Sequence, residues 1–472
     1  MTRAIVGKDG MLYQFWPIPP NYCTRQTSDA PILDGRYASH SIPRVAAPVE
    51  IHHPAFAIFL GHVNDPTLSV PDDMVKTTAQ FMLSQSQIAT AEDQRTNTRL
   101  HLGNLLGISA IPKPNWNRTS SHHVITIPAE ANFGEQAALA IVEEKGELGM
   151  NGEPSVQGSF SYHAFWNDAD RPKLLKACPC PSFIISVAGP WLVICGAIYT
   201  SLPVVHRLTD YIWLGYSRAI DDGHILRVAR IFYALHLGMQ NLKAYYETLE
   251  YNPKDTTSRY FPLATSYVQP NGEKVEFKYK APLKVGDLSC VTYLATDCRD
   301  PQRKLIVKFV ERYGEKAHKL LAENQLAPEL LYYGDVWTIP EAARGSRPRQ
   351  MVVMEYIRGR TAAELKEVPQ CVRDAVKRAL ELLHEQKMVH GDIRLPNVII
   401  QDRDEGEEGD GGNAYDGDKV ADRVKLIDFD WAGDEGTVRY PHFLSRQGRV
   451  AGVEDYGFIL AVHDDAMVRK LL

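Results

Sequence analysis

Two short segments of the chain carry oxygen-bearing side chains whose types and spacing suit phosphoryl transfer. The first segment, residues 390–397, reads HGDIRLPN and places Asp392 and Asn397 on one loop. The second segment ends an apolar run with the carboxylate of Asp428. A carboxylate can orient an attacking hydroxyl, while an Asn and an Asp can hold the Mg²⁺ ions that bridge ATP oxygens. We therefore predict that Asp392 is catalytic and that Asn397 and Asp428 bind metal.

These segments resemble the protein kinase-like superfamily, whose catalytic loop reads H-x-D-x-x-x-x-N and whose metal loop begins with D-F. The HGD form is similar to that of compact atypical kinases and of aminoglycoside and choline kinases. The resemblance implies ATP and Mg²⁺ as cofactors. It places Arg394 where the family has a lysine, so Arg394 is expected to clamp the transferring phosphate, while His390 buttresses the loop. Asp430 replaces the usual glycine of DFG, which adds a carboxylate near the metals.

A strand lysine and a helix glutamate should lie upstream of these segments. Lys308 follows the apolar residues 305–307, where an inward cation could hold nucleotide phosphates as part of the catalytic set. The alternative is an outward, solvated lysine. Glu315 and Glu323 stand on the next polar stretch. By analogy with the spacing in small kinases, we predict that Glu315 pairs with Lys308 and fixes its position.

The nucleotide site should also have a hinge and a phosphate lid. Residues 352–357 form an apolar strand that breaks into a polar turn, so the backbone around Glu355 and Ile357 is predicted to meet adenine. The lid is a poor match, because Gly286 is the only glycine of residues 283–289. Backbone approach to the phosphates is then less free than with three glycines.

The chain that follows Asp428 is short for a full substrate-binding lobe and contains no A-P-E motif. The platform that holds peptide substrates is therefore expected to be curtailed, which argues against a protein kinase more than against a kinase. The signature HGDIR…DFDWAG resembles fungal proteins with a compact kinase domain. These proteins are classed as fungal-type or Crinkler-like kinase-domain proteins.

A second group of charged residues lies in the first half of the chain. Glu143 and Lys145 end an apolar stretch as Glu-x-Lys. Glu92 lies upstream in a helical pattern, and Gln157 begins a later helix. The set resembles the PD-(D/E)XK restriction-endonuclease-like fold, in which carboxylates hold Mg²⁺ and the lysine helps to activate water. The expected aspartate is missing, because no Asp occurs between Asp93 and Glu143. An active nuclease that binds DNA and a degenerate fold used for binding or packing both remain open.

The periodicity of the sequence predicts an α/β first domain, restriction-endonuclease-like, and a two-lobed α+β second domain, protein kinase-like. The predicted order is an irregular Pro-rich arm at 1–75, the nuclease-like domain at 76–250, a linker at 251–270, and the kinase-like domain at 271–472 with an acidic insertion at 401–422. The insertion is expected to be a solvated loop, with Ca²⁺ binding or protein docking as alternatives.

Residues 182–205 form the only run that could be mistaken for a membrane span. Because Gly189-Pro190 interrupts the run and it is rich in Ile, Val and aromatic residues, two buried strands joined by a turn explain it better than a helix. The other predicted elements are helices at 72–106, 155–166, 221–250 and 370–385, strands at 124–127 and 137–142, and antiparallel strands at 275–279, 291–293, 305–307 and 352–354.

The composition is that of an ordinary globular protein. The chain has 472 residues, a net charge of -6 and seven cysteines. The negative charge argues against wholesale coating of nucleic acid. The odd cysteine count does not suggest a disulfide framework, and a metal at Cys178-Pro179-Cys180 is disfavoured because no second pair has zinc-like spacing. Since the first residues lack an apolar signal segment, an intracellular location in the cytoplasm or nucleus is expected.

Three functions compete at this stage. The first is an ATP- and Mg²⁺-dependent kinase that acts on protein Ser/Thr hydroxyls. The second is a metal-dependent DNA nuclease, as in a toxin or effector, regulated by the kinase-like domain. The third is a pseudoenzyme scaffold. The intact set of Lys308, Asp392, Asn397 and Asp428 favours the first. A protein substrate is expected and DNA is possible through the first domain, no membrane is expected, and the oligomeric state stays open.

Overall fold

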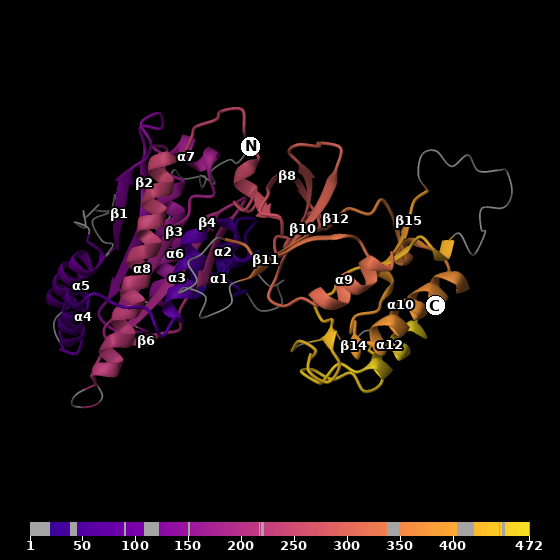
Figure 1. Cartoon of the computed structure of the whole chain (residues 1–472). Coiled ribbons are helices and arrows are strands. Elements are labelled where there is room, and N and C mark those ends of the chain that lie inside the picture. The colour runs from indigo at the N-terminus through magenta and orange to yellow at the C-terminus, as the bar shows by residue number, and fades with distance from the viewer. Residues whose placement is uncertain are drawn as a thin grey trace. The chain divides into compact units, whose positions relative to one another are not determined.

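The computed structural model describes residues 19–37, 45–88, 91–107, 122–149, 152–216, 218, 221–337, 349–403, 420–442, 444–445 and 449–471. These residues fall into two compact units (Figure 1). The first unit comprises the described parts of residues 1–264 together with 286–289 and Trp337, and the second comprises those of 265–285, 290–336 and 349–472. The domain boundaries expected from the sequence stay predictions.

Within the described residues, the first unit is built on a six-stranded sheet. Its strands are β1 (His122–Pro128), β2 (Gln136–Lys145), β3 (Ser182–Ala188), β4 (Trp191–Tyr199), β5 (Pro203–Arg207) and β6 (Ile212–Trp213). The order is β1-β2-β3-β4-β5, with β6 beside β4. β2 and β3 are parallel, and the other neighbours are antiparallel. β3 is buried along its whole length because its side chains are small or apolar on both faces.

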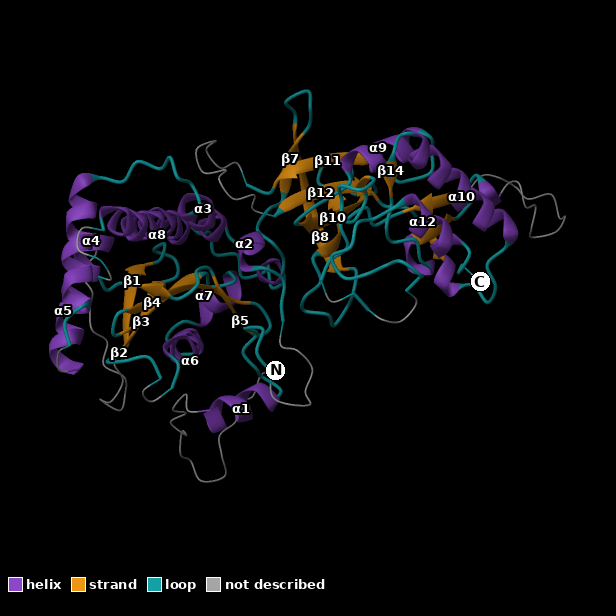
Figure 2. Ribbon diagram, turned by 90° about the horizontal axis from the view of Figure 1, so that it is seen from below, coloured by secondary structure: helices purple, strands orange, loops and turns teal. Residues whose placement is uncertain are grey.

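Helices cover both faces of this sheet (Figure 2). α3 (Pro54–Val63) packs along α8 (Asp222–Thr248) on one face, and α6 (Pro154–Trp166) lies against β2, β3 and β4 on the other. Phe56 and Phe59 of α3 meet Phe183 of β3 edge-on, at ring-centroid distances of 5.2 and 5.8 Å. These aromatic contacts are part of one core that fills the layer between α3, α8 and the sheet and continues under α6 on the other face. The other helices are α1 (Pro19–Thr27), α2 (Val49–His52), α4 (Asp72–Gln85), α5 (Ala91–Leu106) and α7 (Pro172–Ala177).

The apolar run at 182–205 forms β3, β4 and the start of β5, which confirms the predicted strand pair. Gly189 lies at the turn with φ +53°, a left-handed conformation that a residue without a Cβ adopts at little cost. None of the helices in the described ranges combines the length and apolar character needed to cross a bilayer. The predicted helix at 72–106 is instead two helices, because α4 ends at Gln85 and α5 begins at Ala91.

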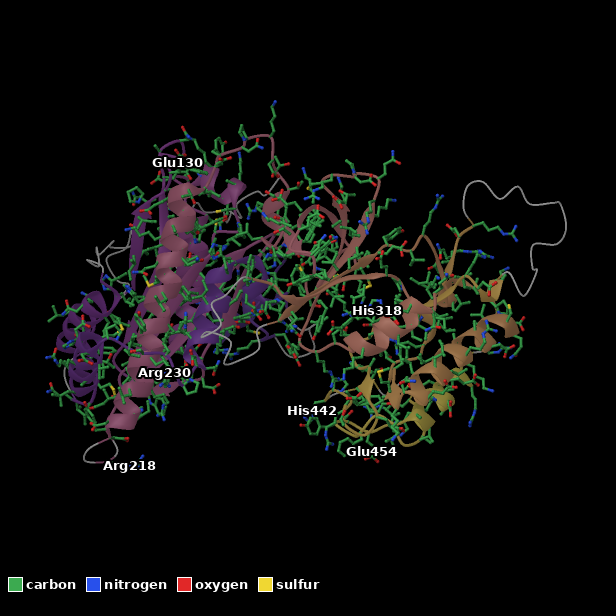
Figure 3. All side chains as sticks on the ribbon, in the orientation of Figure 1. Glu130, Arg218, Arg230, His318, His442 and Glu454 are labelled. Atoms are coloured by element: carbon green, nitrogen blue, oxygen red, sulfur yellow. The ribbon has the colours of Figure 1, made fainter. Side chains whose placement is uncertain are left out.

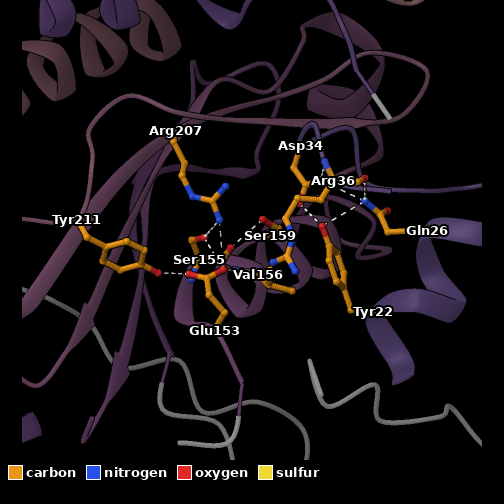
Figure 4. Close-up of polar contacts among 10 residues, drawn as sticks. All are labelled: Tyr22, Gln26, Asp34, Arg36, Glu153, Ser155, Val156, Ser159, Arg207 and Tyr211. Carbon is orange, nitrogen blue, oxygen red and sulfur yellow. Dashed lines mark hydrogen bonds and ion pairs between the residues drawn. The ribbon is translucent and has the colours of Figure 1, made fainter. Parts of the chain in front are cut away.

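A polar network joins residues within the described part of the Pro-rich arm (Figure 4). The Gln26 amide nitrogen donates to Ile32 O at 2.9 Å and to Arg36 O at 2.8 Å, and its oxygen accepts from Ile32 N–H at 3.0 Å. Tyr22 donates a hydrogen bond to Asp34. Neighbouring Leu33 bridges in parallel to β5. The described arm is therefore ordered by backbone and amide pairing rather than irregular throughout.

The second unit begins with an antiparallel sheet, as the period-two pattern predicted. Its strands are β7 (Ser266–Val268), β8 (Lys274–Pro282), β9 (Thr292–Asp297), β10 (Lys304–Val310), β11 (Leu330–Asp335) and β12 (Gln350–Glu355), in the order β11-β12-β10-β9-β8-β7. Val275, Phe277 and Tyr279 alternate inward along β8. Helix α9 (Glu315–Glu323) connects β10 to β11. This sheet and helix position the residues predicted to hold the nucleotide.

The rest of the second unit combines helices with two small sheets among the described residues, one of three strands and one of two. Its elements are β13 (Gly359–Thr361), α10 (Gln370–Glu385), β14 (Met388–Val389), η4 (Leu395–Asn397), β15 (Val398–Gln401), β16 (Val424–Leu426), β17 (Gly433–Asp434) and α12 (Ala461–Val468). The apolar face of α10 packs on α12, β14 and β16. Residues 404–419 of the predicted acidic insertion lie outside the described residues. The two segments predicted to do chemistry are the loops that follow β14 and β16.

Acid should destabilise the first unit through His53. The His53 ring is buried and its Nδ1 accepts from Ala55 N–H at 3.2 Å, which caps α3. Burial lowers the pKa of His53 to about 3. The stability contributed by the neutral ring is complete above the ordinary histidine pKa of 6.5 and is lost as pH falls towards the folded value. His53→Asn keeps a cap acceptor. Between about pH 7.5 and pH 5.5, we expect its free energy of unfolding to fall by about 1.4 kcal/mol less than that of the wild type.

Urea unfolding at the two pH values measures this difference. The matched control is His442→Asn, because His442 is an exposed histidine of the second unit, and this substitution should leave the acid sensitivity unchanged. An acid loss in His53→Asn equal to that of wild type contradicts the assignment.

Candidate functional site

The catalytic loop leaves β14 through a backbone conformation that requires glycine. Gly391 has φ +81°, in the left-handed region. A Cβ at this position would lie 2.9 Å from Ile459 Cδ1, closer than side-chain packing allows. The motif therefore needs glycine at position 391, because the loop has a left-handed conformation there and passes close to the Ile459 side chain.

A buried carboxylate that the sequence prediction missed holds this loop in place. Asp464 of α12 is fully buried, and it accepts from His390 N–H at 2.8 Å and from Gly391 N–H at 2.7 Å. His384 of α10 lies 3.4 Å away from the same carboxylate and its hydrogen bond with Asp464 raises the pKa of His384. Two consecutive backbone N–H groups thus share one anionic acceptor. An acidic residue within a short apolar helix was the only sequence signal for this role.

The structure brings Asp392, Asn397 and Arg394 together. Asn397 Nδ2 donates to Asp392 Oδ2 at 2.8 Å and to the Asp392 carbonyl at 2.9 Å. Arg394 Nη2 lies 3.0 Å from Asp392 Oδ2 and 3.8 Å from Asp428 Oδ2. Burial raises the pKa of Asp392, and the nearby Arg394 opposes that rise. The Asp392 carboxylate is thus oriented by an amide and a guanidinium, while most of the Arg394 side chain stays accessible.

The metal loop follows β16 and is fixed by backbone bonds to the catalytic loop. Ile427 N–H donates to Asn397 O at 3.0 Å. Asp428 has φ +72°, a left-handed conformation that Asp tolerates better than most residues. Phe429 is fully buried between two imidazoles, with ring centroids 4.5 Å from His318 and 5.0 Å from His390. These contacts set the direction in which the Asp428 carboxylate points.

Lys308 of β10 reaches this loop. Its Nζ lies 2.5 Å from Asp428 Oδ1 and 2.6 Å from Asp430 Oδ1, and its side chain is 12% exposed. Burial alone would lower the pKa of Lys308, but the two carboxylates outweigh it and the pKa is raised. Burial would likewise raise the pKa of Asp428, and Lys308 outweighs it, so that pKa is lowered. The predicted inward lysine is therefore present and pairs with the metal loop.

The predicted pair between Lys308 and Glu315 is not formed. Glu315 opens α9 and lies 2.7 Å from Lys319 one turn later, on the solvent side of the helix. The buried side chains of α9 are Ala317, His318 and Leu321, and of these His318 (labelled in Figure 3) stacks on Phe429 of the metal loop. Glu315 stands at the first position of α9, where its carboxylate is held by Lys319 one turn later on the exposed side of the helix.

The predicted hinge lies at the end of β12. Glu355 pairs with Leu305 of β10, and its N–H donates to Glu329 O at 3.0 Å. Ile357 follows in the loop with its side chain buried. Among the described residues, no backbone carbonyl accepts from Ile357 N–H.

The described side chains of the predicted nuclease site lie at the end of β2 and in the first turn of α6. Glu143 is fully buried at the end of β2, where Ser161 Oγ donates to it at 2.5 Å and burial raises the pKa of Glu143 to about 8. Lys145 ends the same strand, and Gln157 lies in the first turn of α6 with its N–H bonded to Glu153 O. The side chain of Glu92 lies outside the described residues.

Comparison with known families gives a match to a segment that lies almost wholly in the second unit. A family model described as lipopolysaccharide core biosynthesis protein (WaaY), a kinase-like family, matches residues 347–428, which run from the start of β12 to Asp428. A comparison with curated proteins finds no match. The match covers less than half of the chain. It supports a kinase-like phosphotransferase without identifying the substrate.

This comparison corrects two expectations from the sequence. The resemblance to fungal-type or Crinkler-like proteins is wrong, because the family that matches the catalytic segment is a different one. The nuclease-like first domain is not supported either, since no such family matches. Within the described ranges, no group of three or more His, Cys, Asp or Glu side chains is arranged to hold a metal ion. The Glu-x-Lys spacing misled because buried strand ends also carry such residues for structural reasons.

The anchoring role of Asp464 is open to direct measurement. We expect Asp464→Asn to lower the stability of the second unit by about 1–3 kcal/mol, because an amide leaves one buried N–H of the catalytic loop without an anionic acceptor. Urea unfolding followed by a local probe in the second unit measures the loss. The control is Asp465→Asn, one residue further along α12 and only half-buried, which should change stability by less than about 0.5 kcal/mol. Equal effects in the two variants contradict the anchoring role.

Proposed function

We propose that the protein is an ATP- and Mg²⁺-dependent phosphotransferase that transfers a phosphoryl group to an alcohol. The observation that carries this proposal is the convergence of Lys308, Asp392 and Asp428 from three separate elements. Lys308 comes from β10, Asp392 from the loop after β14, and Asp428 from the loop after β16. Arg394 and Asn397 join these groups through contacts of 2.8–3.8 Å. A positioned cation beside three oxygen-bearing groups is what phosphoryl transfer needs.

Each residue has a proposed role. Asp392 orients the acceptor hydroxyl and, as a carboxylate, receives its proton. Asn397 and Arg394 hold the Asp392 side chain in position for this role. Lys308 binds the nucleotide phosphates, and Arg394 clamps the transferring phosphoryl group. The backbone at Glu355 and Ile357 meets adenine. These roles need no residue outside the second unit.

Asn397 and Asp428 are the residues that would hold Mg²⁺. The amide nitrogen of Asn397 is committed to Asp392, which leaves its oxygen as the group that a cation would take. Two protein oxygens fit the habit of Mg²⁺, which is usually held by one or two protein ligands together with phosphates and water. Bound there, Mg²⁺ would neutralise charge on the phosphate oxygens.

The acceptor proposed first is a protein Ser or Thr hydroxyl, by analogy with the protein kinases whose catalytic and metal loops these segments resemble. A sugar hydroxyl is the second candidate, and the similarity of residues 347–428 to a kinase-like lipopolysaccharide core biosynthesis family favours it. The two acceptors place the same demand on Asp392, because both present an aliphatic alcohol to the base. Substrate trials therefore decide between them without changing the proposed chemistry.

Removal of the proposed base tests the phosphotransferase directly. We expect Asp392→Asn to lower phosphoryl transfer from labelled ATP by at least about 100-fold while the variant stays folded, because an amide cannot take the hydroxyl proton. Incorporation into generic protein and into lipopolysaccharide core sugars is measured in parallel. Chelation of Mg²⁺ by EDTA should abolish transfer, and added Mg²⁺ should restore it.

The control is Asp434→Asn, an exposed carboxylate of β17 in the same unit, which should retain wild-type transfer. Equal transfer by wild type and Asp392→Asn contradicts the proposal. Label found in protein but not in sugar decides for the first acceptor, and the reverse result decides for the second.

A further inference from the structure

Lys308 has two carboxylate partners, and they follow one another in the metal loop. Asp428 and Asp430 approach Nζ at 2.5 and 2.6 Å. The lysine is nearly enclosed, so its charge depends on these carboxylates for stabilisation. Asp430 is 32% exposed at its side chain and lies beyond the buried ring of Phe429. The loop thus offers Lys308 one more carboxylate than metal binding would use.

The helix that could have supplied a partner does not do so. Glu315 of α9 is 38% exposed and bonds to Lys319. The buried His318 side chain bonds to Tyr313 OH at 2.7 Å and to Pro328 O at 2.8 Å, and its ring stacks on Phe429. Because α9 touches the metal loop through an imidazole, it brings no negative charge to Lys308.

We propose that Asp430 is the positioning residue of Lys308, in the role that the sequence had given to Glu315. This inference rests on the proposed phosphotransferase function. When Asp428 turns to a metal ion, Lys308 keeps Asp430 as a second ion-pair partner at 2.6 Å. The lysine then stays directed at the nucleotide phosphates. The carboxylate that replaces the DFG glycine thereby substitutes for a helix glutamate.

A double-mutant cycle tests the pairing without reference to activity. Lys308→Met and Asp430→Asn are combined, and the unfolding equilibrium constant of the full chain is measured for each single and for the double variant. We expect the double variant to differ by at least about fivefold from the product of the single effects, because both changes remove the same contact. The parallel cycle of Lys308→Met with Glu315→Gln should be multiplicative within about twofold. Coupling to Glu315 as large as that to Asp430 overturns the inference.

Kinetics with ATP test the positioning. We expect Asp430→Asn to lower kcat by at least about tenfold with a smaller change in the KM for ATP, because a misdirected lysine affects phosphate alignment more than adenine binding. Asp430→Glu should recover most of the loss, and Glu315→Gln should stay within about twofold of wild type. Loss of kcat in Glu315→Gln, or none in Asp430→Asn, overturns the inference. Absence of transfer in wild type instead overturns the proposed function, and the double-mutant cycle then still decides the pairing.

Discussion

The candidate site depends on one buried carboxylate that itself has no part in the proposed chemistry. Asp464 accepts the N–H groups of His390 and Gly391, which would otherwise be buried donors without an acceptor. An unmet backbone donor in the interior costs about 1–3 kcal/mol, so the loop conformation and α12 stabilise each other. The direction of Asp392 follows from this bond, because Asp392 comes one residue after Gly391.

Packing also joins this loop to the metal loop, in addition to the hydrogen bond from Ile427 N–H to Asn397 O and the contact of Arg394 with Asp428. Phe429 lies between His318 and His390 and is completely buried. Burial lowers the pKa of His318 to about 4, so its ring is neutral and can stack on the phenyl ring. α9, the catalytic loop and the metal loop therefore meet at one aromatic side chain.

The first unit shows how similar residue types serve stability instead. Glu143, His52 and His53 are buried, and burial favours the neutral form of each. It raises the pKa of Glu143 to about 8 and lowers the pKa of His52 to about 4 and that of His53 to about 3. Glu153 caps α6 by accepting from Ser155 N–H and Val156 N–H at 2.9 Å each (Figure 4). Acidic residues at strand and helix ends in this unit satisfy backbone or side-chain donors. Their spacing alone does not distinguish this role from metal binding.

The sequence alone determined the elements that depend on local periodicity and on turn chemistry. The β3–β4 pair, the antiparallel strands of the second unit and α10 all follow from patterns within a single segment. The sequence motifs also led to Lys308, Asp392, Asn397 and Asp428, which the fold brings together. These residues were recognisable because each stands at a fixed offset within one short stretch.

Only the tertiary structure decided which groups pair across the fold. Asp464 is far from His390 in sequence, and no local pattern connects them. The choice of Asp430 over Glu315 as partner of Lys308 depends on the rotation of α9, which the packing of His318 on Phe429 sets. A helix presents a different residue to the site with each rotation of about 100°. Sequence spacing leaves the orientation of α9 undefined, so only the fold decided which carboxylate pairs with Lys308.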